Sequence, residues 1–204
     1  MTDGSIASYV RDWATSPFAK VTLAAWLVVR DIEFLVCGAL ETISGDYVRE
    51  GEFAVHRTST IESGAILKGP GVIGTNCLVA AGAYLRGATY LGEGCIVGPN
   101  SELKSSFMFA GSKIAHLNFV GDSIIASGVN IEAGAIVANY RNELDDKQIR
   151  IRLGDAVIDT GVDKFGALIG DGARIGANAV VVPGALIAPS TKIGRLQLLD
   201  QYPI

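Results

Sequence analysis

The stretch that decides the fold is residues 61–109, IESGAILKGPGVIGTNCLVAAGAYLRGATYLGEGCIVGPNSELKSSFMF. A large apolar residue returns every six positions, at Ile61, Leu67, Ile73, Val79, Leu85, Leu91, Val97, Leu103 and Phe109. A helix would repeat with a period near 3.6, and a half-buried strand with a period of two. A period of six, with small residues at a fixed offset, predicts hexapeptide repeats wound into a left-handed parallel β-helix, so the fold class is mainly β.

In such a coil three hexapeptides make one turn, and turns stack at about the 4.8 Å spacing of neighbouring strands. The large residues point into the coil, and residues 18 positions apart lie above one another. Cys77 and Cys95 have this spacing, so we expect them to stack inside as small core residues. With Cys37 they make three cysteines and no C-x-x-C pair, which favours a reducing compartment over a disulfide framework.

The period is interrupted in two places. After Phe109 the next anchors would be Ala115 and Gly121, which are poor ones, and clear anchors resume only at Ile125. Residues 143–166 lose the pattern altogether, and there KQIRIRL and AVIDT flank a Gly-Asp pair, which predicts a hairpin protruding from the coil. The repeat returns at Ile169. Local failures inside a regular pattern are where function is expected.

Residues 1–50 carry no such repeat. Ser16-Pro17 opens a run of helix-compatible residues that extends to Ile43 and is closed by Ser44-Gly45. We therefore divide the chain into an N-terminal helical segment, 1–50, and a β-helix, 51–204, and expect the helices to cap the open end of the coil.

Composition excludes several classes of protein. The chain of 204 residues is 49% hydrophobic but only 7% aromatic, and its 21 acidic and 17 basic side chains give a net charge of −4. A nucleic-acid binder would be basic. The most apolar stretch, the nine residues Val21–Val29, is too short to span a bilayer, and the first residues do not resemble a signal peptide. These features predict a cytoplasmic protein without membrane or nucleic-acid partners.

The candidate chemical groups are few. Two histidines, His56 and His116, cannot supply the three-histidine zinc site known on this fold, so we expect no metal. Arg86 and Lys104 are 18 residues apart and each follows an inward anchor, so they should face outward on adjacent turns. Two such cations repel unless a negative group lies between them. That group is either Glu102 or a bound phosphate, which Arg and Lys both bind well.

The segment His116–Tyr140, HLNFVGDSIIASGVNIEAGAIVANY, resembles the acetyltransferase domain of the bifunctional N-acetylglucosamine-1-phosphate uridyltransferase/glucosamine-1-phosphate acetyltransferases, a hexapeptide-repeat acyltransferase family. The later stretch TGVDKFGALIGDGARIGANAVVVPG is similar to the sugar-1-phosphate nucleotidylyltransferase/acetyltransferase branch, which also has a longer hairpin. Together the resemblance covers roughly residues 61–194, and the HLxxxGDxxIxxxxNxxAG pattern does not follow from the six-residue period alone.

The resemblance implies a role for each matching residue. His116 matches the general base that takes a proton from the sugar amine during attack on acetyl-CoA, a task that suits a neutral imidazole, and Glu102 matches the carboxylate that orients it. The implied substrate-binding residues are Arg86, Lys104, Phe119, Asn130 and Asn139. Those implied for the co-substrate acetyl-CoA are Ala133, Tyr140 and Ala177.

Two departures from the family pattern bear on substrate choice. Phe119 stands where the family usually has Tyr, so one hydroxyl contact to the sugar phosphate is lost. Val162-Asp163 precede Lys164 where the branch with the long hairpin has a basic cluster. Residues 1–50 also lack a glycine-rich phosphate loop and are too short for an α/β nucleotide-binding fold, which argues against nucleotidyl transfer by this segment.

The resulting expectation is an acetyl-CoA-dependent N-acetyltransferase acting on an amino-sugar phosphate such as glucosamine 1-phosphate. The alternatives are an acetyltransferase acting on a nucleotide-linked amino sugar or another amine, and a non-catalytic scaffold that binds a sugar nucleotide. The family also implies a homotrimer with shared active sites, and a separate nucleotidyltransferase is a possible partner. An outward face rich in Val, Ala and Gly favours the same assembly.

Overall fold

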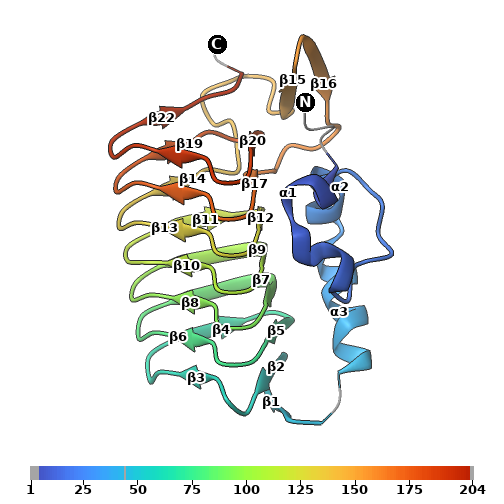
Figure 1. Cartoon of the computed structure of the whole chain (residues 1–204), viewed down its shortest axis with the longest axis vertical. Helices are drawn as coiled ribbons and strands as arrows, with labels where there is room; N and C mark the ends of the chain where they lie inside the picture. The colour runs from blue at the N-terminus through green and yellow to red at the C-terminus, as the bar shows by residue number, and fades with distance from the viewer. Residues whose placement is uncertain (1–4, 44, 203–204) are drawn as a thin grey trace.

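The computed structural model describes residues 5–43 and 45–202, and its strands stack into a β-solenoid of about eight turns (Figure 1). Neighbouring strands along the coil pair in parallel, so each residue lies above its counterpart in the previous turn. Ile73 and Leu91 form one such inward column and are completely buried. Cys77 and Cys95 are also buried, as their spacing predicts, and a hydrogen bond with Cys77 together with burial raises the pKa of the Cys95 thiol.

Each turn has three sides, which we call the first, second and third face in chain order. The first face consists of β3 (Thr60–Ile61), β6 (Leu78–Val79), β8 (Ile96–Val97), β10 (Lys113–Ile114), β13 (Asn130–Ile131), β18 (Arg174–Ile175) and β21 (Lys192–Ile193). The second face contains β4 (Ile66–Lys68), β11 (Phe119–Gly121), β14 (Ile136–Val137), β19 (Val180–Val181) and β22 (Leu198–Leu199). The third face contains β2 (Phe53–His56), β5 (Gly71–Ile73), β12 (Ile124–Ile125), β17 (Ala167–Ile169) and β20 (Ala185–Ile187). Two longer strands, β7 (Tyr84–Leu91) and β9 (Glu102–Met108), run from the second face onto the third.

The interruption of the repeat begins earlier than the sequence suggests. The step between the inward residues Leu103 and Met108 spans five residues instead of six, and so does the later step from Val120 to Ile125. Met108 pairs in register with Ile125 and is completely buried, so it is the inward anchor. The prediction that Phe109 is the anchor is therefore wrong by one position.

The cause is a shortened corner between the second and third faces. One turn places Gly87 and Ala88 between its paired strand positions, whereas the next places only Ser105 there. The register of β7 and β9 shifts by one residue at this corner. Asp122 occupies the same shortened corner one turn further along, since Gly121 pairs with Lys104 and Ile124 with Phe107.

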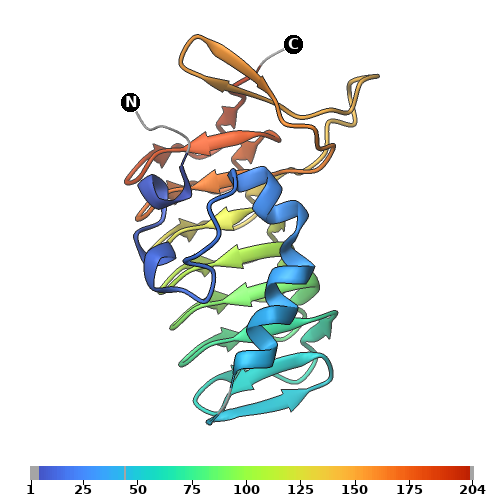
Figure 2. The ribbon, with the colours of Figure 1, turned by 90° about the vertical axis from the view of Figure 1, so that its right-hand side faces the viewer.

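The N-terminal helices cover the third face along its length (Figure 2). They are α1 (Ile6–Tyr9), a 3-10 turn (Arg11–Thr15), α2 (Ala25–Arg30) and α3 (Ile32–Thr42), and α3 packs on β5, β7 and β9. The prediction that these helices cap the end of the coil is wrong. Large apolar side chains project outward from the third face, at Val72, Tyr90 and Phe107. Burying them is favourable, so the helices pack along this face and not over the end of the coil.

A short antiparallel strand, β1 (Tyr47–Glu50), pairs with β2 at the end of the sheet and so begins inside the segment predicted to be helical. Its side chains Arg49 and Glu50 are exposed, and charges on an edge strand discourage pairing with other chains. Ser44, part of the predicted helix stop, lies outside the described residues.

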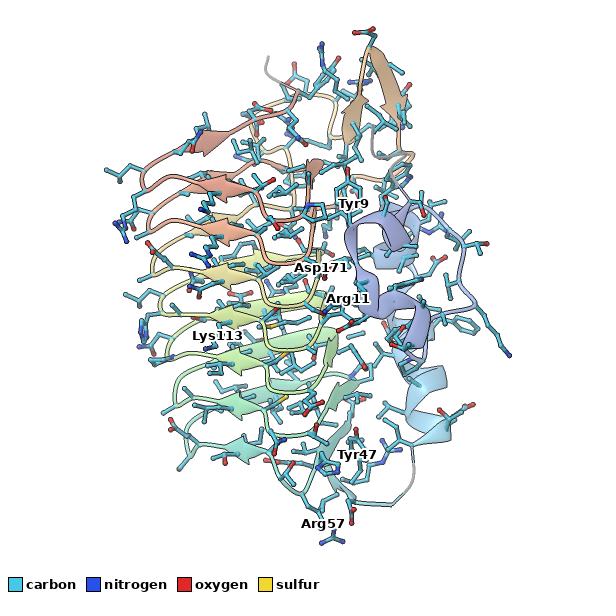
Figure 3. The ribbon with its side chains drawn as sticks, viewed as in Figure 1. Tyr9, Arg11, Tyr47, Arg57, Lys113 and Asp171 are labelled. Atoms are coloured by element: carbon cyan, nitrogen blue, oxygen red, sulfur yellow. The ribbon has the colours of Figure 1, made fainter. Side chains whose placement is uncertain are left out.

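Polar contacts fix the N-terminal segment to the coil (Figure 3). The Ser127 hydroxyl donates to Oδ2 of Asp12 at 2.6 Å, and this bond is the main cause that lowers the pKa of Asp12. The backbone N–H of Arg11 donates to Oδ2 of Asp171 at 2.9 Å, and the backbone N–H of Asp171 donates to the carbonyl of Tyr9 at 2.9 Å. The segment is therefore held to the coil at defined points.

The second interruption contains the antiparallel strands β15 (Arg150–Leu153) and β16 (Ala156–Asp159), joined through Gly154 and Asp155. They form a hairpin that stands out from the coil (Figure 1). The coil then resumes in register, because Val137 pairs with Val181.

Candidate acceptor and acyl-donor sites

Arg86 and Lys104 lie in register on adjacent turns of the second face, as their 18-residue spacing predicts. The Nε atom of Arg86 lies 2.5 Å from Oε1 of Glu102, and both side chains are about one-third exposed. The guanidinium carbon of Arg86 lies 5.9 Å from the centre of the Tyr84 ring. Of the two partners that the sequence left open for Arg86, the carboxylate is therefore present in the structure.

Lys104 has a different partner, which the sequence analysis missed. Its Nζ pairs with Oδ2 of Asp122, and the same oxygen accepts a hydrogen bond from Nδ2 of Asn139. The Lys104 and Asp122 side chains are only 16% and 10% exposed, so water screens this pair less than the pair of Arg86. Gly121 permits the arrangement, because a Cβ there would come within 2.8 Å of the Asn139 amide.

The backbone that presents Asp122 is in the left-handed region. Ser105 has φ 44° and Asp122 has φ 45°, and in earlier turns the same corner is occupied by Gly69 and Gly87. Non-glycine residues adopt this conformation at a cost and are often found at functional sites. Two sequence signals point to Asp122: its place in the shortened step, directly after the glycine that ends β11, and its position as the aspartate of the HLxxxGD pattern.

A cleft of about 660 Å³ lies at this corner, between the coil, the N-terminal helices and the base of the hairpin. Its buried apolar wall consists of Val29, Ile32, Ala88 and Val162. Its charged side chains are Arg30, Glu33, Asp122, Asp146, Lys147, Asp163 and Lys164. An apolar lining with a few polar groups is typical of small-molecule sites.

His116 lies at the other edge of the second face, on the corner shared with the first face. Its side chain is exposed and makes no hydrogen bond to any described residue, while its carbonyl accepts one from the backbone of Gly134 at 2.9 Å. The expected contact with Glu102 is not present. Glu102 lies in register with Phe119, three residues past His116, and its carboxylate is bound to Arg86.

Phe119 is half-buried in the outward column of the second face, between Glu102 and Ile136. Several other apolar side chains on this face and on its corner with the first face are exposed: Ile66 55%, Leu117 66%, Ile136 40%, Leu196 79% and Leu198 63%. Leu117 and Leu196 have positive φ angles of 55° and 60°. This surface has the character of an interaction surface.

The two alanines predicted to contact acetyl-CoA lie on the same corner, in successive turns. The backbone N–H of Ala177 donates to Oε2 of Glu132 at 2.9 Å, and the carbonyl of Ala133 accepts from the N–H of Asn178 at 3.0 Å. Arg195 binds both carboxylate oxygens of Glu132, at 2.8 and 3.0 Å, and this pairing lowers the pKa of Glu132. A ligand here would thus meet a corner whose polar groups are already ordered.

Tyr140, the third residue predicted to bind acetyl-CoA, is 36% exposed and lies at the start of the long insertion. The ammonium of Lys147 lies 5.5 Å from the centre of its ring, a cation–π distance. Tyr140 therefore packs with the base of the hairpin.

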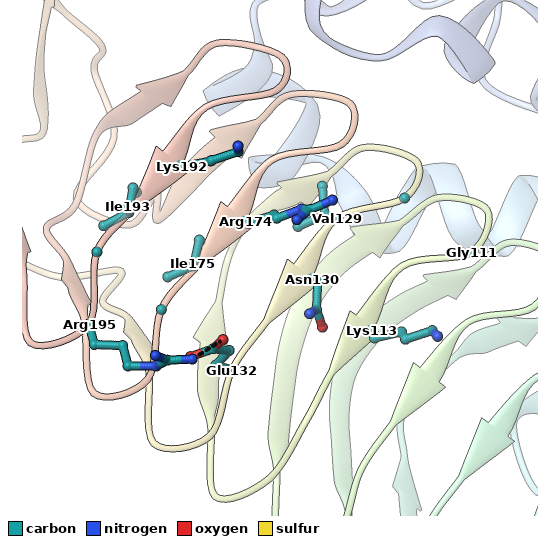
Figure 4. Close-up of a pocket in the computed structure, with 13 residues that line it drawn as sticks. Gly111, Lys113, Val129, Asn130, Glu132, Arg174, Ile175, Lys192, Ile193 and Arg195 are labelled. Atoms are coloured by element: carbon teal, nitrogen blue, oxygen red, sulfur yellow. Dashed lines mark hydrogen bonds and ion pairs between the residues drawn. The ribbon is translucent and has the colours of Figure 1, made fainter.

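Figure 4 shows a second pocket, of about 510 Å³, along the first face and its corner with the second. Lys113, Asn130, Arg174 and Lys192 project from four consecutive strands in register, and all four are exposed. Within residues 5–43 and 45–202 none of the three cations has an ion-pair partner. Asn130 therefore belongs to this cationic column, on a different face from Lys104 and Asn139.

The described residues contain no group of three or more His, Cys, Asp or Glu side chains placed to hold a metal ion. None of their helices has the length and apolar character needed to cross a membrane.

The solenoid of hexapeptide repeats defines the class of protein. Residues 70–105 match the family model described as bacterial transferase hexapeptide (six repeats). The chain is related to the acetyltransferase part of the bifunctional enzymes that its sequence resembles, which confirms the resemblance.

Three curated relatives illustrate this relationship. The chain is 41% identical over 92 residues to a bifunctional sugar-1-phosphate nucleotidylyltransferase/acetyltransferase of Sulfurisphaera tokodaii, covering 45% of this chain and 22% of that protein. It is 36% identical over 102 residues to the bifunctional protein GlmU of Methanococcus vannielii, covering 50% and 24%. It is 33% identical over 101 residues to an uncharacterized acetyltransferase, YaiX, of Escherichia coli, covering 50% and 43%. The chain thus spans less than half the length of each.

A solved structure of a UDP-N-acetylglucosamine acyltransferase superposes with a TM-score of 0.42 at 17% identity, covering 74% of this chain and 57% of that one.

Proposed function

We propose that the chain transfers an acetyl group from acetyl-CoA to the amine of an amino-sugar phosphate such as glucosamine 1-phosphate. The observation that carries this proposal is the pair of stacked cations, Arg86 and Lys104, beside a cleft of about 660 Å³ on a hexapeptide coil. The name of the Sulfurisphaera tokodaii relative, which combines sugar-1-phosphate chemistry with acetyl transfer, supports the same acceptor class.

In this proposal His116 is the general base. The neutral amine attacks the thioester carbonyl, the C–S bond breaks, and the thiolate of CoA leaves. The imidazole takes the proton that the amine nitrogen loses and returns it to solvent or to the thiolate. An exposed imidazole that makes no hydrogen bond to any residue of 5–43 or 45–202 is accessible for this step. Because Glu102 is held by Arg86, its part is to position that guanidinium rather than to orient His116.

The cationic column of the first face suits the phosphates of acetyl-CoA. Asn130 lies in register between Lys113 and Arg174, and Lys192 follows Arg174 on the next turn. The adjacent cations Arg174 and Lys192 repel each other, and a bound anion would relieve this repulsion. The corner with Ala133 and Ala177 adjoins this column, so the acyl arm could run from there toward His116.

We infer that the assembly is a homotrimer. The exposed apolar side chains on the second face and its corner need cover, and His116 lies on a different corner from the Lys104–Asp122 pair, so a second copy would help to complete each site. Light scattering should give about three times the chain mass of 21.3 kDa. A mass near 21.3 kDa at micromolar concentration would contradict the assembly.

We also propose a cytoplasmic location, where acetyl-CoA is made, and a separate nucleotidyltransferase as the partner that consumes the acetylated product. Neither proposal involves nucleic acid or a membrane.

A second candidate is acetyl transfer to a nucleotide-linked amino sugar or another amine. One observation favours it: Arg86 and Lys104 each hold a carboxylate already, so the second face offers an acceptor phosphate less free positive charge than the sequence suggests. In the non-catalytic alternative the chain would bind a sugar nucleotide without turnover.

The test is thiol release from acetyl-CoA across a panel of amino-sugar 1-phosphates, the matching free amino sugars and their nucleotide-linked forms. Fastest release with a sugar 1-phosphate supports the first candidate, and fastest release with another acceptor supports the second. Binding of acetyl-CoA without release on any acceptor contradicts both.

A further inference from the structure

The N-terminal helices form the wall that faces the coil in the cleft of about 660 Å³, which we call the acceptor cleft. At the elbow between α2 and α3, Val29 and Ile32 are buried, whereas Arg30 and Glu33 are exposed, and all four line the cleft. Asp122 lies on the coil side of the same cleft. Segments about ninety residues apart in the sequence thus enclose one cavity.

Of the two charged side chains in this wall, Glu33 is the one that is available to bind a ligand. Arg30 binds both carboxylate oxygens of Asp31, at 2.7 and 2.8 Å, so its charge is compensated. Glu33 has no ion-pair partner in the described part of the chain. It also lines the adjoining groove of about 520 Å³, which contains Lys68 and Arg86. The carboxylate therefore stands where the two cavities meet, opposite the cations of the second face.

The elbow is held in place independently of any ligand. Val29 and Ile32 are buried, and α3 packs on β5, β7 and β9 of the coil. The Trp26 ring of α2 packs edge-on against Phe165, with ring centroids 6.4 Å apart. A binding group carried on such a fixed element keeps its position without paying for order when the ligand arrives.

We propose that Glu33 is an acceptor-binding residue, so that the N-terminal helices determine acceptor specificity. Its carboxylate accepts hydrogen bonds from ring hydroxyls of the acceptor sugar, whose anionic group lies toward Arg86 and Lys104. This assignment rests on the proposed transfer to an amino sugar. Its competitor is a purely structural role, because an acidic side chain in the first turn of α3 also interacts favourably with the helix dipole.

The experiment compares the wild-type chain with Glu33→Gln and with Glu41→Gln, an exposed glutamate of the same helix that does not line the cleft. Thiol release is measured with glucosamine 1-phosphate and with its galactosamine epimer, and Tm is measured for each protein. We expect Glu33→Gln to raise KM for the acceptor about 10-fold and to change the preference between the epimers. KM for acetyl-CoA and Tm should stay at wild-type values, and Glu41→Gln should change nothing.

Several results would overturn the assignment. If Glu33→Gln lowers only Tm, or leaves the acceptor KM and the epimer preference as in Glu41→Gln, Glu33 is structural while the proposed transfer stands. If the wild-type chain releases no thiol with any acceptor, the proposed transfer fails, and saturation-transfer NMR with glucosamine 1-phosphate decides about Glu33. Weaker binding by Glu33→Gln than by wild type then supports the assignment, whereas equal binding, or no binding to wild type, overturns it.

Discussion

The second and third faces of the coil share one inward pattern but have opposite outward surfaces. On the third face Val72 and Phe107 project outward and are 2% and 0% exposed, because the N-terminal helices cover them. On the second face the outward residues Ile66 and Ile136 are 55% and 40% exposed. The repeat therefore determines which residues lie inside the coil, whereas the outward residues determine what each face contacts.

The largest effect is expected at the edge of the uncovered face. His116→Ala should lower turnover about 10²–10⁴-fold, since it removes the general base. Thiol release with the best acceptor measures it. His56→Ala is the matched control, because His56 lies at the end of the coil with its Nδ1 2.9 Å from the Thr58 hydroxyl. Equal activities of the two variants would make His116 a structural residue of its corner.

The covered face should dominate stability. Phe107→Ala removes a completely buried ring that contacts Trp13 and Phe18, and should lower the free energy of unfolding by about 3–5 kcal/mol. Ile66→Ala on the second face should cost about 1 kcal/mol or less, because its side chain is more than half exposed. Urea unfolding compares them. A similar loss for both variants would mean that another copy covers the second face in solution.

The buried ion pair at the boundary of the two faces should affect acceptor use. Lys104→Ala should lower kcat/KM for the phosphorylated acceptor about 10- to 150-fold if the ammonium binds its phosphate. Activity on the same amino sugar without phosphate should barely change, and it serves as the internal control. Equal losses on both acceptors would show that Lys104 acts only by holding Asp122 and Asn139.

The smallest effect concerns the attachment of the helices. The pKa of Asp12 is lowered in the folded protein, chiefly by the bond from Ser127, so this carboxylate stabilises the fold above its unfolded pKa. That contribution is lost as pH falls through the lowered value. Asp12→Asn should therefore reduce stability at pH 7 by up to about 1 kcal/mol and narrow its difference from wild type below pH 3. Urea unfolding at both pH values measures this, and a difference independent of pH would contradict it.

The same contrast explains what the sequence could and could not predict. Inward residues such as Leu85 and Val97 must all fill the same narrow interior and are completely buried. The coil is therefore predictable from the six-residue period at which they recur. The large outward side chains Tyr90 and Phe107 indicate that another element covers the third face. The six-residue period does not reveal this, because it describes only the inward positions. The inward anchor is Met108 and not Phe109, the residue that the six-residue count predicts. Counting sixes therefore assigns the wrong anchor where one corner of the coil is a residue shorter.

The candidate site was predictable in part for a similar reason. The in-register placement of Arg86 and Lys104 follows from spacing alone. Their separate carboxylates do not, because Asp122 reaches Lys104 only through the shortened corner and its left-handed backbone. Contacts between the cleft and Glu33 depend on where the helices pack, which no local pattern encodes.

The long insertion shows how cheaply a solenoid can acquire an appendage. Ile125 is paired on one side with Met108, 17 residues earlier, and on the other with Ile169, 44 residues later, yet all three occupy the same column. The entropy of closing a loop grows only with the logarithm of its length, so the longer circuit costs roughly 1 kcal/mol more than the shorter one. A repeating coil can thus be lengthened at one bend, gain a cavity wall of new composition there, and leave the stacked layers on either side undisturbed.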